Sequence, residues 1–400
     1  WVESTLNELA FINPRESIRK GDLAKNVPMD CIDSFTRKIS RFGIKEFKGG
    51  TKFKNKDVLL ARITPCLENG KTALVDILDK DEIGFGSTEY IVIRENNDKS
   101  HYKFLYYLSI SPKFRRNAIK AMTGTSGRQR VQTDVLINKV FRFPLLPEQK
   151  AIAKVLTSFD DKIELLQAQN KTLESMAQTI FKEWFGKYQI GDELPEGWRV
   201  GEINDLVEFV IDNRGKTPPL IDQSNESYPL IEVNSITGDD RNVNLALGKK
   251  FVDEETYQNW FRKGHPQNGD ILLSTVGSIG QLAQVFNEKI CVAQNIVALR
   301  SNTSGNFLYE LLKRNQKLII NLDISSVQPS IKVPHLISMP VVIPKLELIQ
   351  QFDRVVNKIT IKITSNNQQI QSLTKTRDTL LPKLMSGQVR VNNIKQLAYA

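Results

Sequence analysis

The feature that most constrains this 400-residue chain is an internal repeat with a period of about 200 residues. Three pairs of segments carry the repeat: Ser4–Leu9 with Gly201–Leu206, Asp57–Leu60 with Asp270–Leu273, and Phe104–Leu108 with Phe307–Leu311. The members of these pairs start 197, 213 and 203 residues apart, which predicts loops of different length within one shared framework. Units of a solenoid span only about 20–50 residues. The sequence therefore predicts a duplicated domain with a pseudo-two-fold relation between its halves.

A long helix with heptad spacing follows the globular part of each half. Between Glu148 and Lys187 there is no Pro and a single Gly, and apolar residues alternate steps of four and three. This spacing is typical of a coiled coil, whose a and d positions face a partner helix. The first predicted seam is Ile152, Leu156, Phe159, Ile163, Leu166, Asn170, Leu173, Ala177, Ile180 and Trp184. The second, 200 residues later, is Phe352, Val356, Ile359, Ile363, Asn366, Ile370, Leu373, Arg377, Leu380 and Leu384.

The polar residues of the two seams predict how the helices pair. In a parallel pair, Asn170 and Asn366 would each face an apolar residue, whereas in an antiparallel pair they fall opposite each other and their amides can bond. The same register places these residues opposite each other: Ile163 and Leu373, Leu173 and Ile363, Ile152 and Leu384, Trp184 and Phe352. The alternatives are that each helix packs on its own domain or on a partner protein.

Charge and composition restrict the class of protein. A net charge of +10 at pH 7 and an isoelectric point near 9.3 favour a polyanionic partner. No apolar run approaches the ~18 residues of a membrane span, and the scattered cysteines and histidines suit neither a disulfide framework nor a metal cluster. We therefore expect a protein of the reducing cytoplasm that needs no metal and no cofactor. Because the sequence opens on Trp1 rather than Met, we expect the gene product to begin slightly upstream.

The segments before the two helices are predicted to be mixed α/β domains. Short apolar runs bounded by Asn, Gly and Asp predict strands at Val58–Ile63, Tyr90–Ile93 and Ile271–Leu273. Helical patterns cover Tyr102–Met122, with a break at Ser111-Pro112, and Phe307–Leu322. The predicted fold class is α/β (mixed α+β), with two similar domains joined by two long antiparallel coiled-coil helices. The predicted boundaries are 1–144 for the first domain, 145–188 for the first helix, 189–342 for the second domain, 343–387 for the second helix and 388–400 for a tail.

Motifs for nucleotide binding and catalysis are incomplete in this sequence. Gly70-Lys71-Thr72 and Gly215-Lys216-Thr217 each resemble the end of a phosphate-binding loop, but the required earlier Gly is Pro65 in one and Val210 in the other. The stretch Asp160-Asp161-Lys162 lies on the heptad helix, which predicts a solvated helix surface rather than a carboxylate cluster of a nuclease. The sequence therefore predicts a protein that is not an enzyme, and its length and motifs exclude a fused methyltransferase.

Two α/β domains, each followed by a heptad helix, resemble the specificity (S) subunit of type I restriction–modification enzymes. The amino-acid sequences of four stretches also resemble that family: Arg62–Lys71, Phe143–Ala153, Met176–Phe185 and Arg377–Gly387. This resemblance covers essentially the whole chain. One departure is that Arg377 stands in the second seam where the first has the apolar Ala177, so we expect the two halves to hold partner subunits unequally.

The resemblance implies a DNA sequence-specificity subunit that takes part in DNA methylation and phage defence. Each globular domain would be a target-recognition domain that reads one half of a bipartite double-stranded DNA site. The paired helices would set the spacer between the half-sites and dock two methyltransferase (modification) subunits. Motor/nuclease (restriction) subunits would join in the full complex, and no membrane would be involved.

Loops that carry Arg beside Gly, Ser, Thr or Gln are the best candidates for DNA contact, because such loops reach both phosphates and base edges. By repeat position and composition these loops are Arg62–Lys71 with Ser274–Gln281, Thr123–Arg130 with Ser325–Lys332, and Arg214–Thr217. The candidate DNA-binding residues are Arg62, Thr64, Asn69, Lys71, Thr125, Ser126, Arg128, Gln129, Arg130, Arg214, Lys216, Thr217, Ser274, Thr275, Ser278, Gln281, Ser326, Gln328 and Lys332. For each residue the alternative is an ordinary exposed turn.

The length of the helices predicts a ruler. From Ile152 to Trp184 the seam would be about 48 Å long, which corresponds to roughly 14 base pairs of DNA. The alternative function is a protein-binding coiled-coil scaffold without sequence-specific DNA recognition. Such a scaffold would show no steeply salt-dependent binding to duplex DNA.

Overall fold

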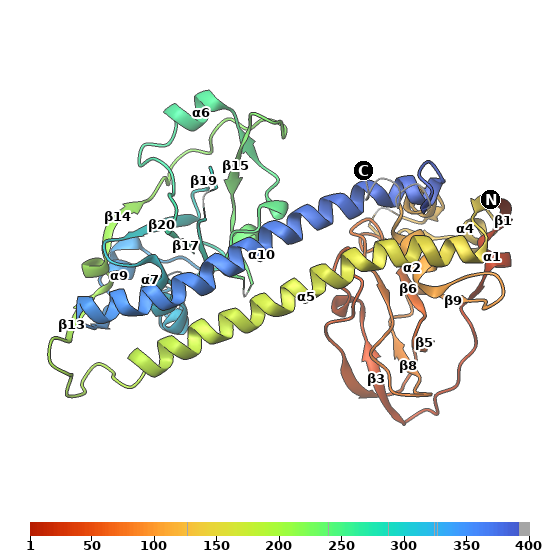
Figure 1. Cartoon of the computed structure of the whole chain (residues 1–400), viewed down its shortest axis with the longest axis horizontal. Helices are drawn as coiled ribbons and strands as arrows, with labels where there is room; N and C mark the ends of the chain where they lie inside the picture. The colour runs from red at the N-terminus through yellow and green to blue at the C-terminus, as the bar shows by residue number, and fades with distance from the viewer. Residues whose placement is uncertain (126, 239, 287, 324, 326, 392–400) are drawn as a thin grey trace. The chain divides into compact units, whose positions relative to one another are not determined.

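The computed structural model describes residues 1–391 except 126, 239, 287, 324 and 326. Its contacts divide the chain into two compact units, one formed by Trp1–Leu165 with the chain from Ile370 onward, and the other by Leu166–Gln369. Each unit holds one globular part and half of each long helix, α5 (Leu146–Phe185) and α10 (Leu346–Ser386) (Figure 1). Among the described residues, no helix is long and apolar enough to cross a membrane.

The globular part of the first unit is a mixed α/β fold with two four-stranded sheets, of order β2-β9-β6-β7 and β4-β3-β8-β5. The pair β3–β8 is parallel, and two-stranded ribbons join β1 to β12 and β10 to β11. The strands are β1 (Val2–Thr5), β2 (Ala10–Ile12), β3 (Leu23–Val27), β4 (Gly43–Glu46), β5 (Thr51–Phe53), β6 (Val58–Ala61), β7 (Thr72–Leu74), β8 (Gly84–Gly86), β9 (Tyr90–Glu95), β10 (Met122–Thr123), β11 (Arg130–Val131) and β12 (Val140–Phe143). The helices before α5 are α1 (Leu6–Leu9), η1 (Met29–Cys31), α2 (Tyr102–Ile110), α3 (Pro112–Lys120) and α4 (Thr133–Ile137).

The second unit repeats this plan. Its four-stranded sheet has the order β14-β20-β17-β18, the ribbon β13–β21 repeats β1–β12, and the three-stranded sheet β16-β15-β19 contains a parallel pair, β15–β19. The strands are β13 (Arg199–Glu202), β14 (Val207–Ile211), β15 (Tyr228–Ile231), β16 (Phe251–Val252), β17 (Ile271–Ser274), β18 (Leu282–Gln284), β19 (Cys291–Val292), β20 (Ile296–Ser301) and β21 (Pro340–Ile343). The helices before α10 are η2 (Ile203–Leu206), η3 (Val233–Ile236), η4 (Leu245–Leu247), α6 (Glu254–Asn259), α7 (Gly305–Arg314), α8 (Gln316–Ile320) and α9 (Val333–Ile337).

A buried ion pair recurs at the same place in the sheets β2-β9-β6-β7 and β14-β20-β17-β18. Arg94 on β9 donates to Asp57 with an Nη2–Oδ2 distance of 2.7 Å, and Arg300 on β20 donates to Asp270 with a distance of 2.9 Å. Each carboxylate also accepts from the backbone amide three residues before it. Because burial of an unpaired carboxylate is costly, this double satisfaction explains why both halves keep Asp ahead of the strand.

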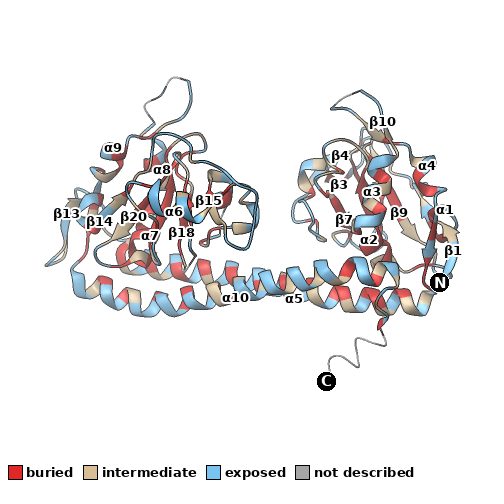
Figure 2. Cartoon of the chain, turned by 90° about the horizontal axis from the view of Figure 1, so that it is seen from above, coloured by how far each residue is buried: buried red, intermediate tan, exposed pale blue. Residues whose placement is uncertain are grey.

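The helices α5 and α10 lie side by side and run antiparallel within each unit (Figure 1). Asn366 Nδ2 donates to Asn170 Oδ1 at 2.8 Å, so the predicted contact between these two amides is confirmed. The rings of Trp184 and Phe352 are 6.1 Å apart, as the predicted register requires. Every seam residue is buried or half-buried, whereas other positions are exposed along one side of each helix (Figure 2).

Each helix also buries a second stripe of residues against the globular parts. In the first unit Ala153 joins a core cluster that contains Leu105 of α2, and in the second unit Phe181 packs on Phe307 of α7 with ring centroids 5.6 Å apart. The helices thus pack on their own domains as well as on each other. Ile152 and Leu384 belong to one core cluster, as their predicted pairing requires. Leu173 and Ile363 likewise belong to a second core cluster. The direct contact of Ile163 with Leu373 stays a prediction.

The prediction that Asp160-Asp161-Lys162 forms a solvated surface is wrong for Asp160. This carboxylate is 4% exposed and accepts from Tyr107 Oη at 2.5 Å and from Arg377 Nη1 at 2.6 Å. Asp161 is exposed but bonds to Arg37 at 2.7 Å. Heptad spacing describes only the face toward the partner helix and could not reveal the face toward the domain. The contact also explains Arg377, because it neutralises Asp160 across the helix pair.

One predicted helix is two helices in the structure. The pattern at Phe307–Leu322 was expected to be continuous, but α7 ends at Arg314 and α8 begins at Gln316. Asn315 between them caps α7, and its side-chain Nδ2 donates to Leu311 O at 2.8 Å. Side chains such as Asn offer the backbone a local alternative to helix bonds, which is why the helix breaks there. The break predicted at Ser111-Pro112 is confirmed, because it separates α2 from α3.

Candidate nucleic-acid interface

In the first unit the fold brings two candidate segments together. Thr64 N donates to Gln129 O at 3.0 Å, and Val131 N donates to Arg62 O at 2.8 Å. These bonds make a short antiparallel ladder around the bridge between Ile63 and Arg130. The loop after β6 and the loop before β11, about 60 residues apart in sequence, therefore form one surface.

The second unit repeats this ladder with equivalent residues. Gly277 N donates to Pro329 O at 2.9 Å, and Ile331 N donates to Thr275 O at 2.8 Å. Relative to the first unit, one side of the ladder is displaced by 213 residues (Arg62 to Thr275) and the other by 200 (Val131 to Ile331). The displacement of 213 equals that between Asp57 and Asp270. In each unit, therefore, backbone hydrogen bonds join two of the candidate segments, and the joined segments occupy matching positions in the repeat.

The candidate side chains of the first unit differ in their exposure and in their hydrogen bonds. Asn69, Thr125 and Arg128 are exposed, and Gln129 is half-buried. Two candidates bond within the first unit: Thr64 Oγ1 donates to Glu68 of the same loop at 3.0 Å, and Lys71 Nζ donates to Met29 O of η1 at 2.8 Å. Ser126 lies outside the described residues.

Two arginines of the ladder converge on one carboxylate. Arg130 and Glu89 form an ion pair of 2.7 Å, and Arg62 Nε lies 3.8 Å from Glu89 Oε2, too far for a hydrogen bond. The hydrogen bond that Arg130 donates to Glu89 raises the pKa of Arg130 above its ordinary value. The side chains of Arg62 and Arg130 are 32% and 42% exposed, so both guanidinium groups are held in place yet remain accessible.

Phe35 and Arg115 adjoin this surface and were not among the candidates. Phe35 has a positive φ of 56°, is half exposed, and donates its backbone amide to Gly70 O at 3.1 Å. The guanidinium of Arg115 lies 4.7 Å from the Phe35 ring centroid, and its Nη2 donates to Leu67 O and Glu68 O. A Cβ at Gly70 would come within 2.5 Å of the Phe35 ring, so this position requires Gly. Sequence alone gave no signal, because the positive φ appears only in the fold.

The candidates of the second unit fall into a buried and an exposed group. Ser274 and Thr275 are buried; Ser274 Oγ donates to Ser278 O at 2.6 Å and accepts from Gln281 N at 2.8 Å. These two side chains therefore support the loop. The exposed or half-buried group is Arg214, Lys216, Thr217, Ser278, Gln281, Gln328 and Lys332. Arg214 bonds to Asp212, which raises the pKa of the guanidinium. Ser326 lies outside the described residues.

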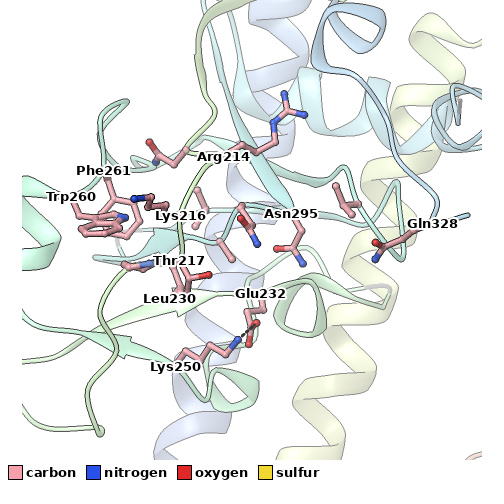
Figure 3. Close-up of a pocket in the computed structure, with 16 residues that line it drawn as sticks. Arg214, Lys216, Thr217, Leu230, Glu232, Lys250, Trp260, Phe261, Asn295 and Gln328 are labelled. Atoms are coloured by element: carbon pink, nitrogen blue, oxygen red, sulfur yellow. Dashed lines mark hydrogen bonds and ion pairs between the residues drawn. The ribbon is translucent and has the colours of Figure 1, made fainter. Parts of the chain in front are cut away.

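A hollow of about 410 Å³ lies where the candidate segments of the second unit meet. Lys216, Trp260 and Phe261 stand at one side in the view of Figure 3, and Asn295 and Gln328 at the other. Gln294 and Lys250 also line it, and Lys250 pairs with Glu232 at 2.7 Å. Amides, cations and an indole ring are the groups that proteins use toward base edges, phosphates and base faces. Gln294, Asn295 and Trp260 were missed from sequence, since they lie outside the Arg-bearing loops.

A family model described as the type I restriction modification DNA specificity domain matches the chain twice, at residues 1–175 and 195–375. The chain belongs to this family. The two matches span both α/β parts and most of both long helices. Its role is therefore that of a DNA specificity subunit in a type I restriction–modification system.

Individual relatives agree with this membership. The MjaIX specificity subunit of Methanocaldococcus jannaschii is 26% identical over 73% of this chain and 70% of its own length. The EcoAI specificity subunit of Escherichia coli is 33% identical, but the match covers 52% of this chain and only 36% of that protein. Among solved structures, the type I restriction–modification S subunit from M. genitalium is 18% identical with a TM-score of 0.54, over 96% of both chains. That likeness concerns the fold.

Proposed function

We propose that each unit of this chain reads one half of a bipartite double-stranded DNA site. The observation that carries the proposal is the backbone ladder found in both units, since it builds two equivalent surfaces from the loops with most candidate residues. The domains at 1–144 and 189–342 would be the target-recognition domains. Two equivalent reading surfaces on one chain suit a site made of two separate half-sites.

The chemistry of these surfaces favours DNA. Exposed Arg128, Lys216 and Lys332 would neutralise phosphates and supply salt-dependent affinity. Arg62 and Arg130, held by Glu89, present guanidinium groups of the kind that reads guanine in the major groove. The net charge of +10 adds long-range attraction to the polyanion.

The long helices carry the second part of the proposal. The segments 145–188 and 343–387 would set the distance between the half-sites and dock two methyltransferase subunits, which restriction subunits join in the full complex. In this scheme the chain itself catalyses no reaction, and the methyl transfer belongs to its partners. The continuous α5 and α10 and their bonded Asn170–Asn366 pair support a spacer of fixed length.

Modified-base sequencing of genomic DNA tests the proposal. A host that carries this chain with its neighbouring methyltransferase should show a gapped two-part adenine-methylation motif, and deletion of this chain alone should abolish it. The purified complex should also bind the motif with a steep salt dependence, and R128A or K332A should each lower that slope by about one unit. Unchanged methylation after the deletion would favour a protein-binding scaffold instead.

A further inference from the structure

The Oδ1 atom of Asn295 is buried and has no hydrogen-bond partner in the second unit. Asn295 stands just before β20 and lines the hollow together with Gln294 and Gln328. Its backbone carbonyl accepts from Thr275 N at 2.9 Å, so the main chain is fixed while the side-chain acceptor is left unused. A buried acceptor without a donor destabilises the fold. Such a group is retained most easily where a ligand supplies the missing donor.

The first unit holds a paired acid at the equivalent position. Glu89 is the equivalent of Asn295, because Arg62 N donates to Glu89 O as Thr275 N donates to Asn295 O. The carboxylate of Glu89 is satisfied by Arg130 of β11 at 2.7 Å. In the second unit the equivalents of Arg62 and Arg130 are Thr275 and Ser330, both too short to serve as replacements for the arginines. The same backbone site therefore holds an internally paired acid in one unit and an unpaired amide acceptor in the other.

We propose that Asn295 is a base-reading residue of the second unit and that it takes the major-groove edge of an adenine. This inference rests on the proposed function. The missing partner of Oδ1 must be an N–H or O–H donor, and the major groove offers the exocyclic amino groups of adenine and cytosine. Only adenine places an acceptor, N7, beside that amino group, which matches the adjacent O and NH2 of one amide. Once its amide turns into the hollow, Asn295 would accept from N6 and donate to N7.

The surroundings of Asn295 fit a nucleotide approaching the hollow. Gln328 and Asn295 line the same side of the hollow from different segments (Figure 3), which offers a second amide for the same or the next base. Exposed Lys216 stands across the hollow and would meet a phosphate. The first unit presents Arg62 and Arg130 at the matching place, so the two half-sites would be read by different chemistry, guanidinium in one and amide in the other.

The test compares the motif methylated with the wild-type chain and with single variants, in the complex with its methyltransferase. N295A should relax base preference at one position of one half-site, with adenine favoured about 10- to 100-fold less than in the wild type. N295D keeps an acceptor but loses the donor, so preference at that position should move from adenine toward cytosine. The matched control is N97D, the same change at an exposed Asn of the first unit outside the candidate loops, which should leave this position unaltered.

A second measurement changes the DNA. Replacing that adenine by 7-deazaadenine removes N7 but keeps base pairing, and should weaken wild-type binding about tenfold or more while leaving N295A binding unaffected. If the N295 variants keep every base preference and merely bind all DNA less well, Asn295 is structural and the inference is overturned. Absence of any gapped motif with the wild-type chain would instead refute the proposed function itself.

Discussion

At the scale of single residues, buried arginines attach the globular parts to the helices. Arg37 and Arg241 occupy equivalent places in the two units. The backbone carbonyl of Arg37 accepts from Leu74 N on β7, and that of Arg241 accepts from Gln284 N on β18. Arg37 reaches Asp161 and Glu164 on α5, whereas Arg241, 1% exposed, bonds to Glu174 on α5 and Glu310 on α7. Burial lowers the pKa of each guanidinium, but the neighbouring carboxylates outweigh this and hold both pKa values above the ordinary range. Both arginines therefore remain charged.

Arg377 should be needed by the first unit because it neutralises buried Asp160. Removing the guanidinium in R377A leaves that carboxylate with only the Tyr107 hydroxyl, so we expect a loss of about 3 kcal/mol of unfolding free energy. The double variant D160N/R377A should recover at least half of this loss, since the buried charge is gone. Urea unfolding followed by circular dichroism measures both values. Equal losses in the single and double variants would contradict the ion pair.

Glu310 should make the stability of the second unit depend on pH. Burial, only partly offset by Arg241, raises the pKa of Glu310 to about 7 from its ordinary value of 4.5. Between these two pH values the folded state holds a proton on Glu310 that the unfolded state has released. The free energy of unfolding therefore decreases as pH rises from about 4.5 to 7, and this group causes no further change above pH 7. E310Q should remove up to about 3 kcal/mol of this change. Urea unfolding followed by tryptophan fluorescence checks it, since Trp184, Trp198 and Trp260 all lie in the second unit.

At the scale of elements, the coiled-coil seam was predictable and the second stripe was not. Alternating steps of four and three depend only on local sequence, and the Asn170–Asn366 contact follows from matching polar positions between two such patterns. The contacts of Asp160 and Glu174 depend on Arg377 and Arg241, which are distant in sequence. Heptad spacing could not predict these contacts, because Arg241 lies in a loop and Arg377 on the other helix, and the position of each depends on the whole fold.

The asparagine pair should fix the helix register at a cost in stability. Asn170 also donates to Asn367 at 2.7 Å, while Asn366 Oδ1 is buried without a partner. N170L should cost about 1–3 kcal/mol, because it leaves Asn366 wholly unpaired. N170L/N366L should be at least as stable as the wild type, since two leucines replace two desolvated amides. Urea unfolding of the single and double variants measures the difference, and additive losses would contradict a direct coupling between the two side chains.

At the scale of the whole chain, the repeat predicted the architecture better than the site. Asp57 and Asp270 bond to equivalent buried arginines, so the sequence of the framework is similar in the two units. This similarity allowed the equivalent loops to be recognised from the sequence. The reading positions diverge instead: Glu89 in one unit is Asn295 in the other, and its partner Arg130 is replaced by Ser330. Composition favoured Arg-bearing loops and so passed over Asn295 and Phe35. Their significance depends on an unpaired oxygen and a positive φ, which exist only once the chain is folded.

The spacer of the DNA site should follow the length of the helices. Removing 166–172 from α5 together with its antiparallel counterpart 364–370 from α10 deletes the asparagine pair as a unit and spares Glu164, Glu174 and Thr360. Seven residues shorten a helix by about 10.5 Å, or about three base pairs, so the gap in the methylation motif should shrink by about three while both half-sites persist. Deleting only 166–172 is the control, and because it breaks the seam it should abolish methylation. A motif whose gap is unchanged in the paired deletion would show that something other than these helices sets the spacing.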